Sequence, residues 1–468
     1  VDIIDFNGSF LARVRDLVGA NPIILVVTKV DLLPEGTDFA AVADWLLAAT
    51  MRKKLNVVSI HLTSAKSGAG IRGVAANIMR ERLGRDVYVL GAANVGKSAF
   101  ISALLDEMAQ HDIMAANARR FRPVQSAMPG TTLGPIAIKA FSSGGDLFDT
   151  PGIHLHHRMP AVVDPADLPL LAPRRRMRPY IVSAPIPDEP ARKARHDDEG
   201  LHWGTLPTDT VSGQSFVTAI GGAAAGDQSG LEIATGAAAE NRVQARGAGS
   251  KTGLAGWSLF WGGLARIDIL QAPPSAKLAF YGATAVRVHF VQTSEADDFY
   301  ERELGHKLSP PSTRHAGGGW KGLQKTPVLQ FTAQAGPRPA GEVAISGLGW
   351  FSISGVEEES HVGSPNEGVS SESQRARAGD STTTKSGTNL TMKTEGNLRK
   401  GRERNDNGVD FSLEVHVPKG VEVFPRSALP VGESAKDWYE WLDLTSYEAS
   451  EDQAKQLPQL FYTDQQRI

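Results

Sequence analysis

One eight-residue segment restricts what this chain can fold into more than any other. It is Gly91-Ala92-Ala93-Asn94-Val95-Gly96-Lys97-Ser98, in which two glycines are separated by four residues and followed by Lys-Ser. An apolar run at 86–90 precedes it, and helix-forming residues at 99–105 follow it. A strand, a glycine loop and a helix in this order are typical of a phosphate-binding loop, in which backbone N–H groups and the helix N-terminus face the phosphates. The pattern predicts an α/β domain.

The side chains of this loop predict distinct roles. Lys97 supplies a cation to the β- and γ-phosphates, and Ser98 offers its hydroxyl to Mg²⁺. The alternative is a glycine-rich turn without a ligand, which the flanking strand and helix disfavour. The residues predicted to bind the nucleotide here are Asn94, Val95, Gly96, Lys97, Ser98 and Ala99.

Strands and helices alternate around the loop. A continuous apolar run at 23–27 predicts a strand buried on both faces, and residues 56–62 predict a second strand. Residues 38–54 and 71–83 have apolar residues at helical spacing. Residues 1–6 also look like a strand. We therefore expect a mostly parallel α/β sheet.

Two further turns carry residues suited to a phosphate site. Asp149-Thr150-Pro151-Gly152 follows the short apolar run 146–148; Asp149 can hold Mg²⁺ and the Gly152 N–H can sense the γ-phosphate. Thr132, in the turn Pro129–Thr132, can complete the Mg²⁺ shell. Alone, either segment is equally an exposed turn.

Two short motifs predict a guanine site. In Thr28-Lys29-Val30-Asp31, the Asp31 carboxylate can accept hydrogen bonds from guanine N1 and N2, and the Lys29 stem can cover the base. Ser64-Ala65-Lys66 can present a backbone N–H to guanine O6. Each is weak alone, but both follow predicted strands, where nucleotide sites of open α/β sheets lie.

In this chain the guanine-reading motifs precede the phosphate-binding loop, and that order resembles the circularly permuted GTPases. Within them the chain looks most like the YqeH family, which includes organellar relatives in plants and animals. The resemblance covers about 1–180, 257–355 and 409–430. It is carried by Asp5–Phe10, Asp149–His154, Gly262–Arg266, Ser346–Trp350 and His416–Val421.

The resemblance implies a circularly permuted P-loop GTPase domain followed by a β-rich α+β C-terminal domain. It implies GTP/GDP and Mg²⁺ as ligands, hydrolysis of GTP to GDP and phosphate, and a role in assembly of the small ribosomal subunit through contact with its rRNA. Because the eukaryotic members of the family are organellar, we expect a chloroplast or a mitochondrion. Lys97, Thr132 and Gly152 are the expected catalytic residues.

Three positions qualify this expectation. Thr28 stands where the family has asparagine, so we expect a weakened guanine preference that Asp31 retains. Ile153 stands where many GTPases place a water-orienting glutamine, so intrinsic hydrolysis should be slow. An asparagine at the position of Asn94 is linked in the family to K⁺ binding.

Composition divides the chain into five parts. Two stretches are poor in aromatic residues and have the composition of disordered insertions. The predicted parts are the permuted G domain 1–157, a basic connecting segment 158–180, a low-complexity insertion 181–256, a β-rich domain 257–430 interrupted by a disordered loop 356–408, and a C-terminal tail 431–468.

The net charge of −3 provides no general affinity for nucleic acid, so RNA contact would need local patches such as Arg174–Arg178. That run is equally well explained as a solvated linker.

The absence of cysteine excludes disulfides and Cys-ligated zinc, and no apolar run is long enough to span a membrane. The chain starts at Val1, so we expect a segment to precede it. His154, His156 and His157 are explained better as solvated residues than as metal ligands.

Two rivals to a switched GTPase remain. The first is an RNA- or ribosome-binding scaffold whose G domain binds GTP or GDP with little turnover, which Ile153 favours. The second is a P-loop ATPase, which Asp31 disfavours. The sequence leaves the oligomeric state open.

Overall fold

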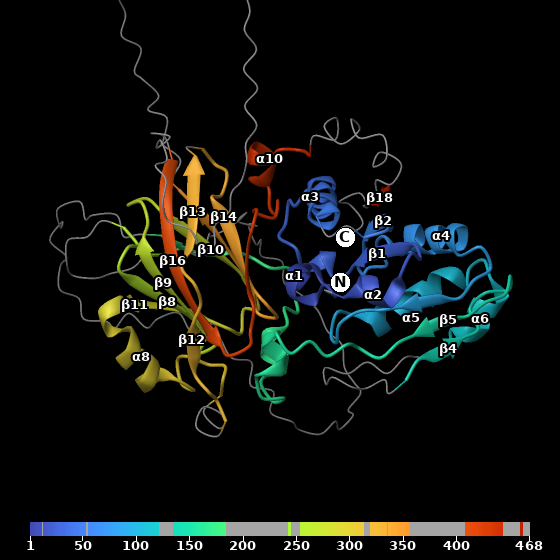
Figure 1. Ribbon diagram of the computed structural model, residues 1–468, viewed down its shortest axis with the longest axis horizontal. Helices are drawn as coiled ribbons and strands as arrows, with labels where there is room; N and C mark the ends of the chain where they lie inside the picture. Colours follow the sequence, from blue (N-terminus) through green and yellow to red (C-terminus); the bar gives the residue numbers. More distant parts are fainter. Residues whose placement is uncertain are drawn as a thin grey trace, which may run out of the picture. The chain divides into compact units, whose positions relative to one another are not determined.

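The computed structural model (Figure 1) describes residues 1–11, 13–52, 55–120, 134–183, 242–244, 253–312, 319–334, 336–355, 408–442 and 459–461. Apolar side chains form one cluster around the N-terminal α/β part and another around the β-rich part. Among the described residues, no helix is long and apolar enough to cross a membrane.

The first sheet of the α/β part is parallel throughout, in the order β1-β2-β18. Its strands are β1 (Ile23–Val27), β2 (Val57–Leu62) and β18 (Gln459–Phe461). The strands predicted at 23–27 and 56–62 are thus confirmed as β1 and β2. Helix α3 (Phe39–Met51) begins after Asp38, whose carboxylate accepts a hydrogen bond from the Ala40 N–H.

A second sheet, in the order β3-β5-β4, carries the predicted phosphate site. Strands β3 (Val87–Val89) and β5 (Leu147–Asp149) are parallel, and β4 (Ile136–Ile138) pairs antiparallel with β5. Helices α4 (Ile71–Arg82) and α5 (Lys97–Met108) share an apolar core with this sheet and with α6 (Ile113–Ala118). The α/β class of this part is therefore confirmed.

The prediction of a strand at residues 1–6 is wrong. Only Asp2 forms a bridge, to Thr28, and the chain then enters the 3₁₀ turn η1 (Ile3–Asp5) and the short helix α1 (Phe6–Ser9). The Asp2 carboxylate accepts from the Ile4 N–H, and the Asp5 carboxylate accepts from the Gly8 N–H. Such local side-chain bonds compete with strand pairing and favour a turn.

The β-rich part consists of two antiparallel-dominated sheets that share one core. In the first, the order is β17 (Val423–Arg426), β14 (Gly341–Ile345), β15 (Gly349–Ser354), β10 (Lys277–Gly282), β6 (Tyr180–Ser183) and β7 (Arg242–Gln244). In the second, it is β11 (Val288–Gln292), β8 (Trp257–Trp261), β9 (Ala265–Gln271), β16 (Gly408–Pro418) and β12 (Leu323–Lys325), with β13 (Leu329–Gln334) also on β16.

Alternate residues of both sheets point into this shared core, as sheet-on-sheet packing requires. Trp261 of β8, for example, meets Phe280 of β10 edge to face at 5.2 Å. Helix α8 (Ala296–Glu303) packs Phe299 and Tyr300 against Phe260. The β-rich α+β character of the C-terminal part is confirmed.

The connecting segment is anchored at several points. It contains η3 (Met159–Ala161) and α7 (Leu168–Leu171). Within the basic run Arg174–Arg178, Met177 is buried and donates its N–H to Leu32 O. Strand β6 continues to Ser183, so the packed part of the chain extends into the stretch predicted as an insertion from 181. The rest of that stretch, except 242–244 and 253–256, lies outside the described residues, as does 356–407.

The tail is partly docked on the α/β part. Helix α10 (Ala435–Trp438) is a single turn within this tail. Tyr439 Oη and the Leu442 N–H both donate to Asp44 of α3, at 2.8 and 2.9 Å. The remaining short elements are α2 (Val14–Val18), η2 (Val30–Leu32) and η4 (Thr293–Glu295).

Candidate nucleotide-binding site

The predicted phosphate loop lies between β3 and α5, as its flanks require. Gly96, immediately before α5, has a φ of +95°, and Asn94 has a φ of +64°, so the loop takes two left-handed residues in three. Val95 is buried against Leu11 and Ala92, which fixes the loop from below. This conformation is the one that turns backbone N–H groups toward a common centre.

Lys97 starts α5 and folds back over the loop. Its Nζ donates to Ala92 O at 2.9 Å and to Gly91 O at 3.2 Å. Burial lowers the pKa of Lys97, and the nearby negative charge of Asp149 opposes that shift. The ammonium is thus held by two neutral carbonyls, which an anionic ligand can replace.

Asp149, at the end of β5, is a buried carboxylate without a partner. It is 1% exposed, and neither oxygen has a hydrogen-bond partner. Burial raises the pKa of Asp149, and Lys97 opposes the shift. A buried anion lacking hydrogen bonds is costly, and a cation is what would satisfy it. The residues present therefore fit Mg²⁺, with Ser98 half-buried at the start of α5; Thr132 lies outside the described residues.

The segment after Asp149 pairs with the phosphate loop. Ala93 N donates to Ile153 O at 2.9 Å, and Ile153 N donates to Gly91 O at 3.1 Å. Gly152 lies so close that a Cβ there would be 2.9 Å from Ala93 Cα and 3.1 Å from Lys97 Nζ. Only glycine fits this contact, which places the Gly152 backbone beside the lysine ammonium.

The loop after β1 is tied directly to the phosphate loop. Thr28 Oγ1 lies 2.6 Å from Val95 O, and Lys29 Nζ donates to Asn94 O at 2.9 Å. Lys29 itself has a φ of +65°. Thr28 thus makes the loop-to-loop tie through its hydroxyl, which is the function expected of the asparagine it replaces.

The loop after β2 joins the same edge. Val30 N donates to Thr63 O at 3.3 Å, which brings the Asp31 loop beside Ser64. Ser64 is buried, and its N–H and Oγ bond within its own loop, to Ala69 and Ser67. The half-buried Asp31 carboxylate accepts no hydrogen bond from the described residues. Within this loop, Ala65 and Lys66 are the residues whose amides remain for a ligand.

Sequence reasoning missed three charged residues that build this site. Asp2 accepts from Lys29 Nζ at 2.5 Å. Arg158 is buried; its Nε donates to Asp5 at 2.8 Å, and its other guanidinium nitrogen donates to Ala93 O at 2.8 Å. Burial raises the pKa of Asp5, which the Arg158 charge opposes. These partners are far apart in the sequence, so no local pattern connects them.

Segments 153–159 also reach the β-rich part. Met159 N donates to Ser346 O at 2.7 Å, and Glu422 N donates to His157 O at 3.0 Å. The His157 ring nitrogen lies 3.0 Å from Gly8 O, while His154 and His156 are exposed.

One cluster of His and carboxylates occurs in the described part of the β-rich domain. His416 Nε2 lies 3.0 Å from both Asp268 and Glu414. Arg266 Nε and Lys325 Nζ lie 2.7 Å from the same two carboxylates. Burial alone would raise the pKa of Asp268, but hydrogen bonds from His416, Arg266 and Ser258 lower it to about 2. We describe this cluster as an ion-pair network.

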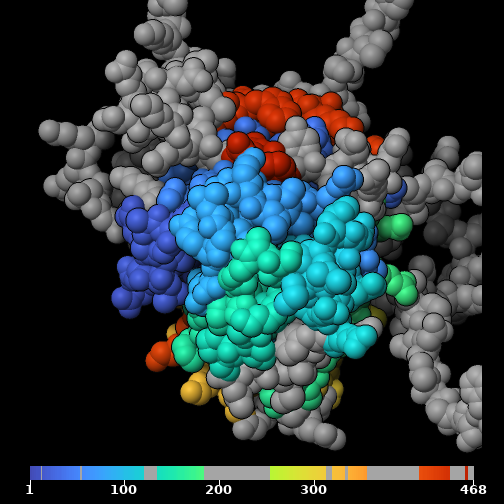
Figure 2. All heavy atoms as spheres, turned by 90° about the vertical axis from the view of Figure 1, so that its right-hand side faces the viewer, coloured from blue at the N-terminus to red at the C-terminus, as the bar shows by residue number. Residues whose placement is uncertain are grey.

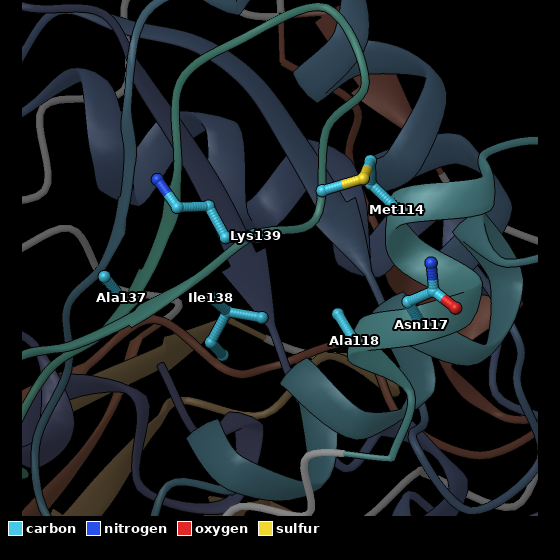
Figure 3. A pocket seen from close by; sticks show the side chains of 6 residues that line it. All are labelled: Met114, Asn117, Ala118, Ala137, Ile138 and Lys139. Atoms are coloured by element: carbon cyan, nitrogen blue, oxygen red, sulfur yellow. The ribbon is translucent and has the colours of Figure 1, made fainter.

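A shallow hollow of about 270 Å³ lies away from these loops (Figure 3). Figure 3 shows side chains of α6 on one side of it and residues of β4 on the other. It is lined by Met114, Asn117, Ala118, Ala137, Ile138 and Lys139. None of these residues belongs to the predicted motifs, so the hollow is separate from the nucleotide site.

Comparison with known proteins agrees with this geometry. A family model described as "50S ribosome-binding GTPase" matches residues 86–173. The chain is 45% identical over 96% of its length to NO-associated protein 1, chloroplastic/mitochondrial, of Arabidopsis thaliana, and spans 64% of that relative.

Two bacterial proteins are also similar. YqeH of Bacillus subtilis is 28% identical over 77% of this chain and 75% of its own length. The small ribosomal subunit biogenesis GTPase RsgA of Hamiltonella defensa is 33% identical over 23% of this chain and 31% of its own length. The resemblance indicated by the motifs is confirmed: this chain is homologous to YqeH and to NO-associated protein 1, and its residues 86–173 match a GTPase family model.

Proposed function

We propose that this chain binds GTP at the Gly91–Ser98 loop, hydrolyses it to GDP and phosphate, and acts as a nucleotide-switched factor in assembly of the small ribosomal subunit. The observation that supports hydrolysis most is that Lys97 and Asp149 lie near enough for the charge of each to shift the pKa of the other. A half-buried ammonium and a buried carboxylate without hydrogen bonds stand side by side at the loop. The triphosphate and its Mg²⁺ would supply what each group lacks.

The residues divide the work as follows. Lys97 neutralises charge on the β- and γ-phosphates, and the backbone of Asn94 to Ala99 binds their oxygens. Ser98 and Asp149, with Thr132, would hold Mg²⁺, which supplies charge neutralisation in phosphoryl transfer. The Gly152 N–H would bind the γ-phosphate; a Cβ at Gly152 would lie 3.1 Å from Lys97 Nζ, so this backbone is close to the ammonium.

Guanine preference and circular permutation belong to the same proposal. Asp31 has an unbonded carboxylate, and its loop is tied to the phosphate loop although it comes earlier in the chain. We propose that Asp31 reads guanine N1 and N2 and that Ala65 or Lys66 donates to O6. Competition between GTP and ATP for the site tests this, and equal affinities would contradict it.

The output of the switch would run through residues 153–159. Ile153 pairs with the phosphate loop, Arg158 with Ala93 and Asp5, and Met159 with Ser346 of the β-rich domain. A shift of Gly152 on loss of the γ-phosphate would therefore be felt at the β-rich domain over six residues of chain.

The ribosome as partner rests on the relatives. One is named for biogenesis of the small ribosomal subunit, and the matching family model is named for binding to the 50S subunit. The Arabidopsis relative is named chloroplastic/mitochondrial. We propose small-subunit assembly in an organelle, with the exposed residues Arg174 to Arg176 as one rRNA contact.

Co-sedimentation with isolated ribosomal subunits tests the partner. The protein is mixed with small or large subunits in K⁺ buffer, with GDP or a non-hydrolysable GTP analogue. Stronger pelleting with small subunits in the analogue state is expected. Preference for large subunits, or no pelleting, would refute the small-subunit assignment.

A second function is favoured by Ile153. Its side chain packs against Leu11, Ala92 and Val95, so it offers no polar group to the attacking water. A ribosome-binding scaffold that holds nucleotide with little turnover follows from this arrangement. Single-turnover hydrolysis with and without small subunits separates the two, because only the switched GTPase accelerates when subunits are added.

Asn94 is proposed as a K⁺ site. Its exposed position on the phosphate loop would place a monovalent cation beside the phosphates, where the cation can offset developing charge. Turnover several-fold faster in K⁺ than in Na⁺ is expected, and equal rates would contradict this role.

A further inference from the structure

The outer edge of β2 is covered by a segment from the far end of the chain. Strand β18 pairs in parallel with β2, with Gln459 opposite Ser59, Leu460 opposite Ile60 and Phe461 opposite His61. Figure 2 shows β18, in dark red, at the surface beside light-blue residues of the α/β part. Without it, β2 would be an edge strand with unpaired backbone groups.

Both faces of β18 make specific contacts. The Phe461 ring stacks on the His61 ring, with centroids 4.3 Å apart and planes within 4°. Burial lowers the pKa of His61 to about 4, so the stacked imidazole is neutral near pH 7. Leu460 points the other way, onto the apolar cluster that contains α3.

Helix α4 completes the seat. A Cβ on Gly73 of α4 would lie 3.5 Å from the His61 ring and 3.9 Å from the Phe461 ring, so α4 passes close to the stacked pair at this residue. Arg80, two turns further along α4, donates to the Gln459 side chain at 2.8 Å. The segment therefore contacts α3, β2 and α4 at once.

We propose that the outer edge of β2 is a strand-binding groove, that its occupant is this chain's own segment Gln459–Phe461, and that occupancy holds the loop Thr63–Ala69 in place. Addition of an extended segment to a sheet edge is a recurrent mode of peptide binding, with backbone bonds for affinity and alternate side chains for specificity. Three paired residues form a short strand, so the segment is exchangeable.

The loop is the element that the groove controls because the two elements that flank it, β2 and α4, both contact β18. β2 runs directly into Thr63 and Ser64, and α4 begins at Ile71, just after the loop. Only the identity of this loop as the guanine-reading element rests on the proposed function. The effect on loop order does not.

Hydrogen exchange of the full chain tests the groove without any nucleotide. Phe461→Ala removes the stacked ring; Trp441→Ala, at an exposed residue of the same tail, is the matched control. We expect amides of β2 and of the 63–69 loop to exchange about tenfold faster in Phe461→Ala and unchanged in the control, since local opening sets their rate. Equal exchange in Phe461→Ala and the native chain would overturn the proposal.

A peptide in trans tests the occupant. A labelled synthetic peptide of residues 455–468 should bind a chain ending at residue 454, restore slow exchange of β2 there, and fail to bind the full chain, whose groove is filled. Binding equally well to both chains, or to neither, would overturn the proposal. GDP release is measured alongside: unchanged release with faster loop exchange would leave the groove intact and remove only the guanine-reading assignment of the loop.

Discussion

At the scale of single residues, Asp149 is a buried carboxyl group in the site, and neither of its oxygens accepts a hydrogen bond. Burial raises its pKa, so the folded protein favours the protonated form. Its effect on stability is therefore absent below its ordinary pKa, and the destabilisation appears as pH rises through the raised value. In the nucleotide-free protein no protein donor satisfies either oxygen of this buried carboxyl group.

Asp149→Asn should therefore stabilise the nucleotide-free protein and weaken nucleotide binding. Removal of an unsatisfied buried charge is worth about 1 kcal/mol or more, which corresponds to a Tm increase of roughly 2–4 °C for a domain of this size. Mg²⁺-dependent GTP affinity should fall at least about tenfold. Thermal melts in EDTA and fluorescent-GTP titrations with and without Mg²⁺ measure both. A lower Tm for the variant in EDTA would mean that the protein itself satisfies the carboxylate.

Site residues that are neighbours in the sequence could be predicted, whereas contacts between residues far apart in the sequence could not. Gly91–Ser98 and its flanking strand and helix are one continuous pattern, and the structure places them as predicted. Thr28 and Lys29 could be predicted as strand-end residues, yet their bonds to Val95 and Asn94 could not. Asp2 and Arg158 gave no signal at all, because a single charged residue has no periodicity and its partner is chosen by the fold.

At the scale of elements, the contact between the Asp149–Gly152 turn and the phosphate loop depends on a missing Cβ. Gly152→Ala would place a methyl group 2.9 Å from Ala93 Cα, so the turn must move off the loop. We expect GTP hydrolysis to fall at least about tenfold, since sub-ångström misplacement at a phosphoryl site is costly, while GDP affinity changes only a few-fold.

Gly134→Ala is the matched control for that variant. A Cβ at Gly134 meets nothing within 4 Å, so turnover should be unchanged. The measurement is phosphate release under multiple-turnover conditions together with GDP titration. If both alanine variants hydrolyse GTP as the native chain does, the close contact of Gly152 plays no part in the reaction.

The cross-strand pair between β14 and β17 predicts a pH dependence. Burial raises the pKa of Glu342 to about 7, and the Arg426 charge opposes the shift. A raised folded pKa means that stability is present below the ordinary value of 4.5 and is lost as pH rises through about 7. Glu342→Gln should lose this dependence, so the stability difference between the two chains should change by about 1–3 kcal/mol between pH 5 and pH 8.

Urea unfolding at the two pH values measures that change, with Glu422→Gln, an exposed carboxylate of the same domain, as control. A difference that is constant between pH 5 and pH 8 would show that Glu342 keeps its proton-binding equilibrium on folding.

Elements were predictable where the apolar period was long. The apolar patterns that predict β2, α3 and α4 extend over most of each element. Val1–Phe6 is short, and there the carboxylates of Asp2 and Asp5 accept hydrogen bonds from backbone N–H groups and favour η1 and α1 over a strand. β18 is three residues in a polar tail, and it becomes a strand only because β2 offers an edge. The extended conformation of this segment depends on pairing with β2, so the sequence of the tail alone does not predict it.

At the scale of the whole molecule, a buried arginine lies on one of the connections between the phosphate loop and the β-rich domain. Arg158 bonds the phosphate loop at Ala93 and the N-terminal turn at Asp5, and the next residue, Met159, bonds Ser346 between β14 and β15. Removing one partner of a buried pair leaves the other charge uncompensated, which costs about 3–5 kcal/mol. Arg158→Ala would therefore confound folding with coupling.

Arg158→Lys separates the two. Lysine keeps the charge near Asp5 but has no second donor in fixed geometry for Ala93 O, because the two bonds of Arg158 leave from one planar group. Arg175→Lys, at an exposed arginine of the connecting segment, is the control.

The readout is hydrogen exchange of β14 and β15, compared between GDP and a non-hydrolysable GTP analogue. In the native chain and the control we expect the two nucleotides to give exchange that differs several-fold at these strands. In Arg158→Lys the difference should disappear while both nucleotides still bind within a few-fold of native affinity. A difference that survives in Arg158→Lys would mean that nucleotide state reaches the β-rich domain by another route, such as the bond between His157 and Glu422.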